Sequence, residues 1–590
     1  MKLIVEILDG KISEAMRKVS GLGDCRALVK QSTDAKFGDY QANGVMAIAK
    51  QLKANPRQLA EQVVGVLDLG QMCEEPEIAG PGFINLRLKK EFLSGLLLEV
   101  NADKERLGIE KTESPKTVVV DYSAPNIAKQ MHVGHLRSTI IGDCISRVME
   151  FDGNNIIRQN HIGDWGTQFG MLIAYLKKEN PQVIENPDSV EIADLEGFYQ
   201  SAKAACDADA EFDATARKEV VKLHNKDADT IKVWEHIVDE SRKHYQPIYE
   251  VLGVTLTQGD ERGESFYADR LQSVVEDLRA KGVAEESDGA MCVFPDREKF
   301  KNKDGDPLPF IVQKSDGAFL YATTDCAAIR YRVGEIGADK IIYVTDARQA
   351  LHFQMLFETV KLAGWVKDET ELVHVTFGTM LGEDNKPFKT RTGGTVKLKD
   401  LLEEAVERAK EIVKNKNPEF DDEKINEIAK AVGIGAVKYA DYSNNRNSDY
   451  VFSFDKMLAM EGNTAPYMQY AYARVKSIER KAAEKGLDIA GELANISTVE
   501  LTEDAELDLA KHLIRYGEAI SVASADCRPN FLTSYLYDLG QKFSSFYNAC
   551  PVLSAGEKQR PTRVLLCDLT ARTMKHGLNE LLGIEVVEQM

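Results

Sequence analysis

The chain has 590 residues, which is enough for several domains. Hydrophobic residues make up 43% and charged residues 28%, a balance typical of globular proteins, and no run approaches the ~20 consecutive apolar residues of a membrane span. The net charge of −20 excludes a generally basic nucleic-acid-binding surface, although it does not exclude a local basic face.

The amino terminus mixes charged residues into an apolar pattern, which predicts an amphipathic helix rather than a secretory signal or a transit peptide. The nine cysteines are scattered, and no two of them have CxxC spacing. We therefore expect reduced thiols, no structural zinc and a cytoplasmic protein.

Residues 1–112 have the pattern of a compact α+β module. Residues 36–52 pass from a turn into an amphipathic helix, and residues 80–88 combine a glycine-rich turn with a strand.

The next segment predicts a parallel βαβ unit. Residues 117–123 form a β-branched run typical of a buried strand, residues 132–151 have apolar residues at helical spacing, and residues 154–163 form a second strand and turn. Strand, helix and strand in this order favour a right-handed crossover.

Residues about 190–308 interrupt this rhythm with a charged, mostly helical stretch. Strand patterns return just after Pro309 and at residues 340–347 and 372–380, and beyond residue 400 the pattern is helical almost to the end. An α/β fold with a doubly wound sheet split by an insertion is the simplest interpretation.

The sequence His132-Val133-Gly134-His135 stands where the loop after the first strand enters the helix. Such a junction exposes backbone N–H groups and the positive end of the helix dipole, which suits a phosphate group. Two imidazoles three residues apart can donate to the same phosphate oxygens, and Gly134 leaves room for a flat adenine. Two ordinary surface histidines are the alternative, which the βαβ context makes less favourable.

Longer segments extend this motif: residues 38–43, 80–85, 121–143, 160–170, 314–332 and 461–476. They resemble, in the same order, segments of the arginyl-tRNA synthetase family, whose members are class I aminoacyl-tRNA synthetases. The resemblance covers nearly the whole chain.

The resemblance implies a Rossmann-like parallel sheet with an inserted subdomain, an α+β N-terminal domain and an all-helical C-terminal anticodon-binding domain. The implied boundaries are residues 1–112 for a tRNA-elbow-binding domain, 113–400 for the catalytic domain with its insertion, 401–460 for a helical stem-contact linker and 461–590 for the anticodon-binding domain.

The implied activity is ATP-dependent activation of L-arginine to arginyl adenylate and transfer to the 3′-terminal adenosine of tRNA(Arg), with tRNA needed for activation. The implied partners are tRNA(Arg), L-arginine and ATP with Mg²⁺, without a structural metal, a membrane or DNA, and we expect a monomer. Two alternatives stay open: another HxGH nucleotidylyltransferase, although such enzymes are usually much shorter, and a catalytically silent tRNA-binding relative.

Class I enzymes also carry a lysine loop, KMSKS, after the last strand of the fold. Here residues 382–394 take its place, and Lys386 and Lys389 keep the lysine spacing but not the intervening residues. The resemblance assigns catalysis to the two histidines, to both lysines and to Lys129, and ATP binding to His132, Gly134, His135 and Lys389. How the three lysines divide the phosphate contacts stays open.

A selective site for arginine needs a carboxylate placed for a bidentate contact, because the guanidinium is planar and always protonated. Asp325 follows Tyr321 by four residues, which places both on one face of a helix. The resemblance assigns both to guanidinium recognition and assigns arginine binding also to Asp121, Asn126 and Gln349. His161 and Asp164 belong to a resembling segment without a defined role. Because such a polar pocket discriminates by ~10⁴ or more, we expect no editing domain.

The carboxy-terminal helices are not strongly basic, so RNA recognition there would depend on bases stacking on aromatic rings and on a few arginines. Tyr467, Tyr470, Tyr472 and Arg474 are candidates, although helical aromatics lie more often in a core.

Overall fold

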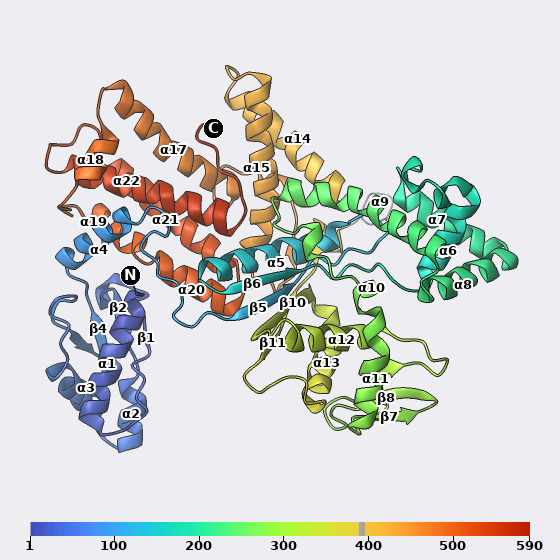
Figure 1. The fold of residues 1–590 in the computed structure, drawn as a ribbon. Helices are drawn as coiled ribbons and strands as arrows, with labels where there is room; N and C mark the ends of the chain where they lie inside the picture. Colours follow the sequence, from blue (N-terminus) through green and yellow to red (C-terminus); the bar gives the residue numbers. More distant parts are fainter. Residues whose placement is uncertain (1, 389–395) are drawn as a thin grey trace.

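The computed structural model describes residues 2–388 and 396–590. The N-terminal module pairs an antiparallel sheet, in the strand order β1-β2-β4-β3, with helices α1, α2 and α3, whereas α4 packs against the C-terminal helices (Figure 1). Helix α2 confirms the helix predicted within residues 36–52, and β4 confirms the strand predicted within residues 80–88, whereas β2 was not predicted. Its elements are α1 (Ile4–Ser20), β1 (Val29–Gln31), β2 (Tyr40–Ala42), α2 (Val45–Leu52), α3 (Pro56–Gly65), β3 (Glu77–Ala79), β4 (Phe83–Leu86) and α4 (Lys90–Ala102).

The central sheet is parallel, with strand order β11-β10-β5-β6. Val118 and Val120 of β5 join the core on one face, and Val119 joins the core on the other, as the period of two along a strand requires. Helix α5 covers the first face, and α12 and α13 cover the second (Figure 1). The elements are β5 (Thr117–Asp121), α5 (Val133–Phe151), β6 (Asn155–Gln159), α12 (Tyr321–Gly334), β10 (Lys340–Asp346), α13 (Ala350–Leu362) and β11 (Glu371–Phe377).

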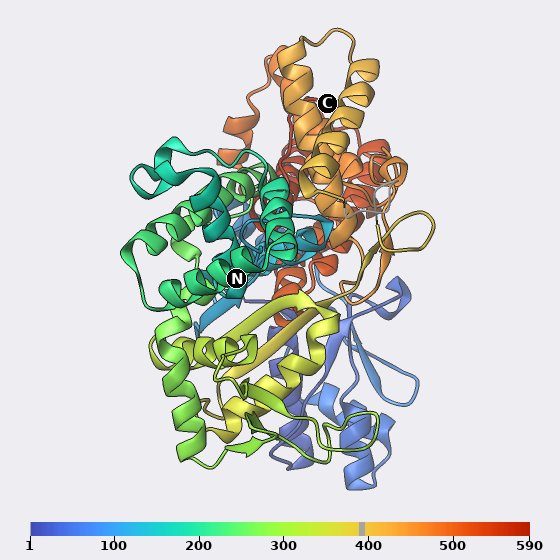
Figure 2. The same ribbon diagram turned by 90° about the vertical axis from the view of Figure 1, so that its right-hand side faces the viewer.

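The segment between β6 and α12 is mostly helical, as predicted. The strand predicted after Pro309 exists as β9, but it pairs antiparallel with β8 in a separate three-stranded sheet and not with the central sheet. Figure 1 shows this insertion on the other side of the central sheet from the N-terminal module, and the view turned by 90° looks onto the insertion helices (Figure 2). Its elements are α6 (Thr167–Glu179), α7 (Leu195–Ala208), α8 (Ala210–His224), α9 (Ala228–Leu252), α10 (Glu264–Tyr267), α11 (Leu271–Ala280), β7 (Ala284–Ser287), β8 (Ala290–Val293) and β9 (Phe310–Gln313).

Beyond residue 400 the described chain is helical except for β13, which pairs with β12. The elements from β12 onward are β12 (Met380–Leu381), α14 (Leu398–Lys416), α15 (Asp422–Tyr442), β13 (Tyr450–Val451), α16 (Phe454–Met457), α17 (Ala465–Glu484), α18 (Ile489–Asn495), α19 (Asp504–Leu513), α20 (Tyr516–Asp526), α21 (Asn530–Ala549), α22 (Arg560–Lys575) and the π-helix η7 (His576–Leu581). None of the helices in the described ranges has the length and apolarity needed to cross a bilayer.

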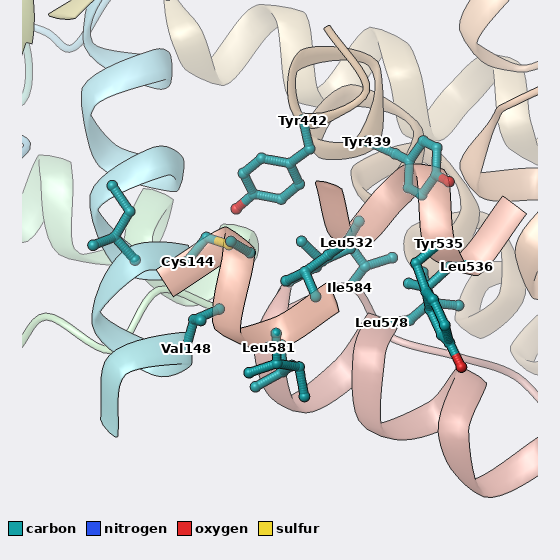
Figure 3. Close-up of a cluster of buried hydrophobic side chains, with 14 of the residues drawn as sticks. Cys144, Val148, Tyr439, Tyr442, Leu532, Tyr535, Leu536, Leu578, Leu581 and Ile584 are labelled. Carbon is teal, nitrogen blue, oxygen red and sulfur yellow. The ribbon is translucent and has the colours of Figure 1, made fainter. Parts of the chain in front are cut away.

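The C-terminal helices pack directly on helix α5. Cys144 and Val148 of α5 lie in one apolar cluster with residues of α15, α21 and η7, including Tyr442, Leu532 and Leu581 (Figure 3). The Tyr442 hydroxyl donates to the Ile140 carbonyl at 2.9 Å. The core around the central parallel sheet is therefore continuous with that of the C-terminal helices.

The N-terminal module is joined to the C-terminal helices by buried polar contacts. The Tyr40 hydroxyl donates to Glu518 Oε1 at 2.7 Å, and Gln31 Nε2 donates to Glu518 Oε2 at 2.7 Å. Lys511 Nζ lies 2.8 Å from Asp39 Oδ1. These contacts join the first fifth of the chain to helices α19 and α20.

Candidate functional site

The loop after β5 holds three non-glycine residues in the left-handed region: Ser123, Ala124 and Ala128 have φ values of 74°, 48° and 58°. This conformation costs ~1–3 kcal/mol per residue and persists only where the surroundings fix it. Side chains from three other segments accept the N–H groups of these residues at 2.9–3.0 Å, namely Ser138, Asn160 and Ser241. The loop is therefore rigidly positioned at the carboxyl edge of the sheet, where α/β folds bind ligands.

His132 and His135 form a reciprocal cap at the start of α5. His132 Nδ1 accepts the Gly134 N–H at 3.0 Å, and His135 Nδ1 accepts the His132 N–H at 3.1 Å. Because an accepting ring nitrogen carries no proton, each neutral ring carries its proton on Nε2. The ring centroids are 4.0 Å apart, so the site presents two Nε2–H donors at a helix N-terminus.

Gly134 is needed for this cap. A Cβ atom at position 134 would lie 2.7 Å from His132 Cε1, closer than carbon atoms can approach. The cap thus supplies a reason for glycine at position 134 besides the room that an adenine would need.

Both histidines are neutral at pH 7. Burial, together with the neighbouring His132, lowers the pKa of His135 to about 4. Burial also lowers the pKa of His132, and the positive charges of Arg348 and Lys129 lower it further. The two imidazoles therefore act as hydrogen-bond donors and not as cations.

This depressed pKa makes stability depend on pH. Between pH 6.5 and pH 4, His135 is protonated in the unfolded chain but stays neutral in the folded chain. The contribution of His135 to the free energy of unfolding is therefore complete above pH 6.5 and is lost as the pH falls toward 4. We expect the wild-type protein to lose ~2 kcal/mol more than His135→Asn between pH 7.5 and pH 5. Urea unfolding of the catalytic domain at both pH values measures this difference, and equal losses would contradict it.

Two cations flank His132. Lys129 is exposed, with Nζ 4.7 Å from the centre of the Tyr199 ring on α7. Arg348, which the sequence analysis did not single out, lies two residues after the end of β10; its side chain is 86% exposed and contacts Asp346 at 2.7 Å. The sequence offered one signal for Arg348: it stands immediately before Gln349, which was predicted to bind arginine.

The lysine loop is described at its two ends. Lys386 is exposed, and its carbonyl accepts the Gly382 N–H at 2.8 Å in a turn that folds back on β12. Beyond the loop, the Val396 carbonyl accepts the Val133 N–H at 3.1 Å. The loop therefore rejoins the described chain beside the histidine motif, and Lys389 lies outside the described residues.

Tyr321 and Asp325 lie on the first turns of α12, as predicted. His352 of α13 contacts Asp325, with 2.6 Å between Nε2 and Oδ2. The Tyr321 ring lies 4.9 Å from the His352 ring and is 65% exposed. His352, which the sequence analysis missed, therefore fixes one oxygen of Asp325, and no described residue forms a hydrogen bond with the other.

Glu264 on α10 provides a second carboxylate. Burial raises its pKa, and the charges of the nearby Asp164 and Asp325 add to the rise. Asp164 itself is buried and accepts the Ser265 N–H at 2.8 Å, so it positions the short helix that carries Glu264. His161 lies beside this helix, with Nδ1 3.0 Å from the Arg262 carbonyl oxygen.

Asp121, the last residue of β5, is buried. Its Oδ2 is 2.5 Å from Nη2 of Arg332, a fully buried side chain whose Nε donates to Gln159 Oε1 at 2.7 Å. Because the Asp121 carboxylate is used inside the domain, its position favours support of the pocket over direct contact with a ligand. Asn126 and Gln349 are both exposed, Asn126 in the loop that follows β5 and Gln349 one turn before His352.

The C-terminal domain carries a separate cavity of about 550 Å³. Tyr470 is 43% exposed in its wall, and the Arg474 guanidinium lies 4.7 Å from the Tyr547 ring centre. Tyr472, by contrast, is only 4% exposed, so its inclusion in an RNA-facing surface was wrong. Tyr467 is half-buried, and its ring packs 5.7 Å from that of Tyr537.

Three families match successive parts of the chain. The Arginyl tRNA synthetase N terminal domain matches residues 6–88, the catalytic domain of the tRNA synthetases class I (R) matches residues 97–454, and the DALR anticodon binding domain matches residues 468–590.

Known proteins match over the full length. The arginine–tRNA ligase of Hahella chejuensis is 52% identical over 99% of both chains, and that of Klebsiella pneumoniae is 51% identical over 100% of both. Among solved structures, the arginyl-tRNA synthetase of Plasmodium falciparum has a TM-score of 0.86 at 32% identity, and that of Thermus thermophilus has a TM-score of 0.80 at 25% identity; each comparison covers 100% of both chains.

Proposed function

The chain belongs to the arginyl-tRNA synthetase family and is an arginine–tRNA ligase, and from this premise we propose how its residues divide the reaction. The carboxylate of arginine attacks the α-phosphorus of ATP, an O–P bond forms, and the bond to pyrophosphate breaks. A hydroxyl of the terminal adenosine of tRNA(Arg) then attacks the carbonyl carbon, and AMP leaves. The paired Nε2–H donors at the start of α5, together with an Asp325 carboxylate held by His352, are the observation that carries this assignment.

His132 and His135 stabilise the charge that builds on the phosphate oxygens in the first step. Their donors are fixed before the reaction by the reciprocal cap, so little reorganisation is needed in the transition state. Gly134 leaves the adenine face open. Lys129, Lys386, Lys389 and Arg348 are the cations available to the phosphates. Mg²⁺ enters with ATP as part of the substrate; the described residues contain no cluster of three His, Cys, Asp or Glu side chains suited to a metal.

Asp325 receives the guanidinium of arginine. His352 holds its carboxylate in one orientation, and the exposed Tyr321 ring covers the same face. Glu264 adds a second negative charge within electrostatic range of Asp325. Asn126 and Gln349 are then available to the α-amino and carboxylate groups, with Asp121 supporting the pocket through Arg332.

The cavity around Tyr470 receives a base of the anticodon. An exposed tyrosine and the Arg474–Tyr547 pair provide the stacking surfaces on which splayed RNA bases are recognised. The N-terminal module contacts the tRNA elbow, and residues 401–460 contact its stem. We propose that the enzyme acts as a monomer in the cytoplasm.

Charging of total tRNA with each labelled amino acid tests this function. Arginine alone is expected to be incorporated, and Tyr470→Ala is expected to raise KM for tRNA by ~5- to 150-fold, since a stacked base contributes ~1–3 kcal/mol. Incorporation of a different amino acid would overturn the pocket assignment.

We propose that activation of arginine requires bound tRNA. Pyrophosphate exchange without tRNA is therefore expected to be absent, and full exchange would contradict this requirement.

A further inference from the structure

A second cavity, of about 690 Å³, lies at the end of α5 opposite the histidine pair. Its volume falls in the range of small-molecule sites. Helix α5 has 19 residues, so ~28 Å separates the two ends. The walls come from the segment after α4, the end of α5, β6, the turn after α9 in the insertion, α22 and η7. All three parts of the chain therefore meet at this cavity.

The cavity is basic in a strongly acidic chain. Six basic residues line it against three acidic ones, Glu105, Glu150 and Glu580. The basic residues are Lys104, Arg106, Arg147, Arg158, Arg572 and Lys575. Three of these are paired with carboxylates: Arg147 lies 2.7 Å from Asp143, Arg158 lies 2.7 Å from Glu150, and Arg572 lies 2.8 Å from Asp568.

The remaining cations are less well neutralised. Arg106 donates to two carbonyls, those of Ile109 at 2.9 Å and Phe151 at 2.6 Å, and forms no ion pair with a described residue. Lys104 donates to the neutral Asn101 side chain at 2.9 Å.

Arg572 lies 2.8 Å from Asp568, but its Nη1 is buried and has no hydrogen-bond partner in the described chain. Burial lowers the pKa of Lys104, and the charge of Arg572 lowers it further. Lys104 and Arg572 thus repel each other, and Asp568 offsets part of this repulsion.

We propose that this cavity binds a small polyphosphate anion, such as inorganic tripolyphosphate or the triphosphate of a nucleotide. Phosphate oxygens match the fork of an arginine and the point charge of a lysine, and several converging donors suit a chain of phosphates. The cations surround a recessed space bounded by separate segments, which favours a small ligand over the extended track of an RNA backbone. A bound polyphosphate would link the N-terminal segment, the catalytic helix and the last helix of the chain.

Inorganic tripolyphosphate is the probe. Its binding to the full-length protein is measured by calorimetry without tRNA, and hydrogen exchange locates it. We expect protection of amides in residues 104–108 and 575–582.

We expect the double variant Lys104→Gln/Lys575→Gln to bind tripolyphosphate at this site at least 10-fold more weakly. Both side chains are exposed, so the fold should be retained. The charge-matched control, Lys361→Gln/Lys367→Gln, changes two exposed lysines on and beyond α13 and should bind as the wild type does.

Protection confined to residues 131–135 would place the probe in the active site alone and overturn the proposal. Equal binding by the double variant and the control would also overturn it. If no tripolyphosphate binds but Lys104→Gln/Lys575→Gln raises KM for tRNA in arginylation, the cavity contacts the tRNA backbone, and the small-ligand proposal is wrong. Arginylation by the wild type measures the proposed function separately from each of these outcomes.

Discussion

Asp325→Asn is expected to lower kcat/KM for arginine by between ~30-fold and ~5,000-fold. Asparagine keeps the shape of the side chain and an oxygen for His352, but it turns an amide donor toward the guanidinium and removes the charge that balances it. Truncating one partner of a buried charge pair costs ~2–5 kcal/mol, and each 1.36 kcal/mol is tenfold in rate. The measurement is charging of tRNA over a range of arginine concentrations.

Glu335→Gln is the matched control. Glu335 caps the far end of the same helix, α12, and pairs with Arg270 on the surface, so its loss should leave kcat/KM within about twofold. KM for ATP should change little in either variant. If Asp325→Asn retained kcat/KM for arginine within threefold of the wild type, Asp325 would not be the guanidinium ligand.

His135→Asn is expected to lower kcat by ~10²- to 10³-fold, the usual effect of removing one preorganised donor from a transition state. The Asn side chain can still accept the His132 N–H through its oxygen, in the place of Nδ1, but it does not reach the position of Nε2. The cap should therefore survive while the donor is lost. Single-turnover adenylate formation in the presence of tRNA measures this step directly.

The complementary variant is His135→Gln, whose amide reaches the Nε2 position and restores a donor. It should recover part of the lost kcat even though it weakens the cap. Equal loss of kcat in the Asn and Gln variants would assign His135 a structural role instead of a catalytic one.

The sequence predicted the elements that carry local patterns. Strands β5 and β10 are largely continuous apolar runs, and α5 has apolar residues at helical spacing. The pattern of buried positions was therefore enough to predict these three elements. The separate sheet of β7 to β9 was not predicted, because a short strand pattern does not reveal its pairing partner. Tyr472 was misplaced for a related reason: aromatic residues two positions apart in a helix face different directions, and only packing decides which one is exposed.

The missed site residues depend on contacts between distant segments. His352 follows Asp325 by 27 residues, and α10, which carries Glu264, is only four residues long and is positioned by Asp164. Asp121 was predicted at the right edge of the sheet, but its partner Arg332 lies 211 residues away, so the sequence could not show that its carboxylate is occupied.

The contact between Tyr40 and Glu518 also constrains the order of events during synthesis. The two residues are separated by 478 positions, and a ribosome adds ~5–20 residues per second. The N-terminal module therefore emerges ~24–96 seconds before the helix that covers Tyr40 exists. Throughout that interval the face bearing Tyr40, Gln31 and Asp39 is exposed to solvent, so the nascent chain must remain soluble without its final partner.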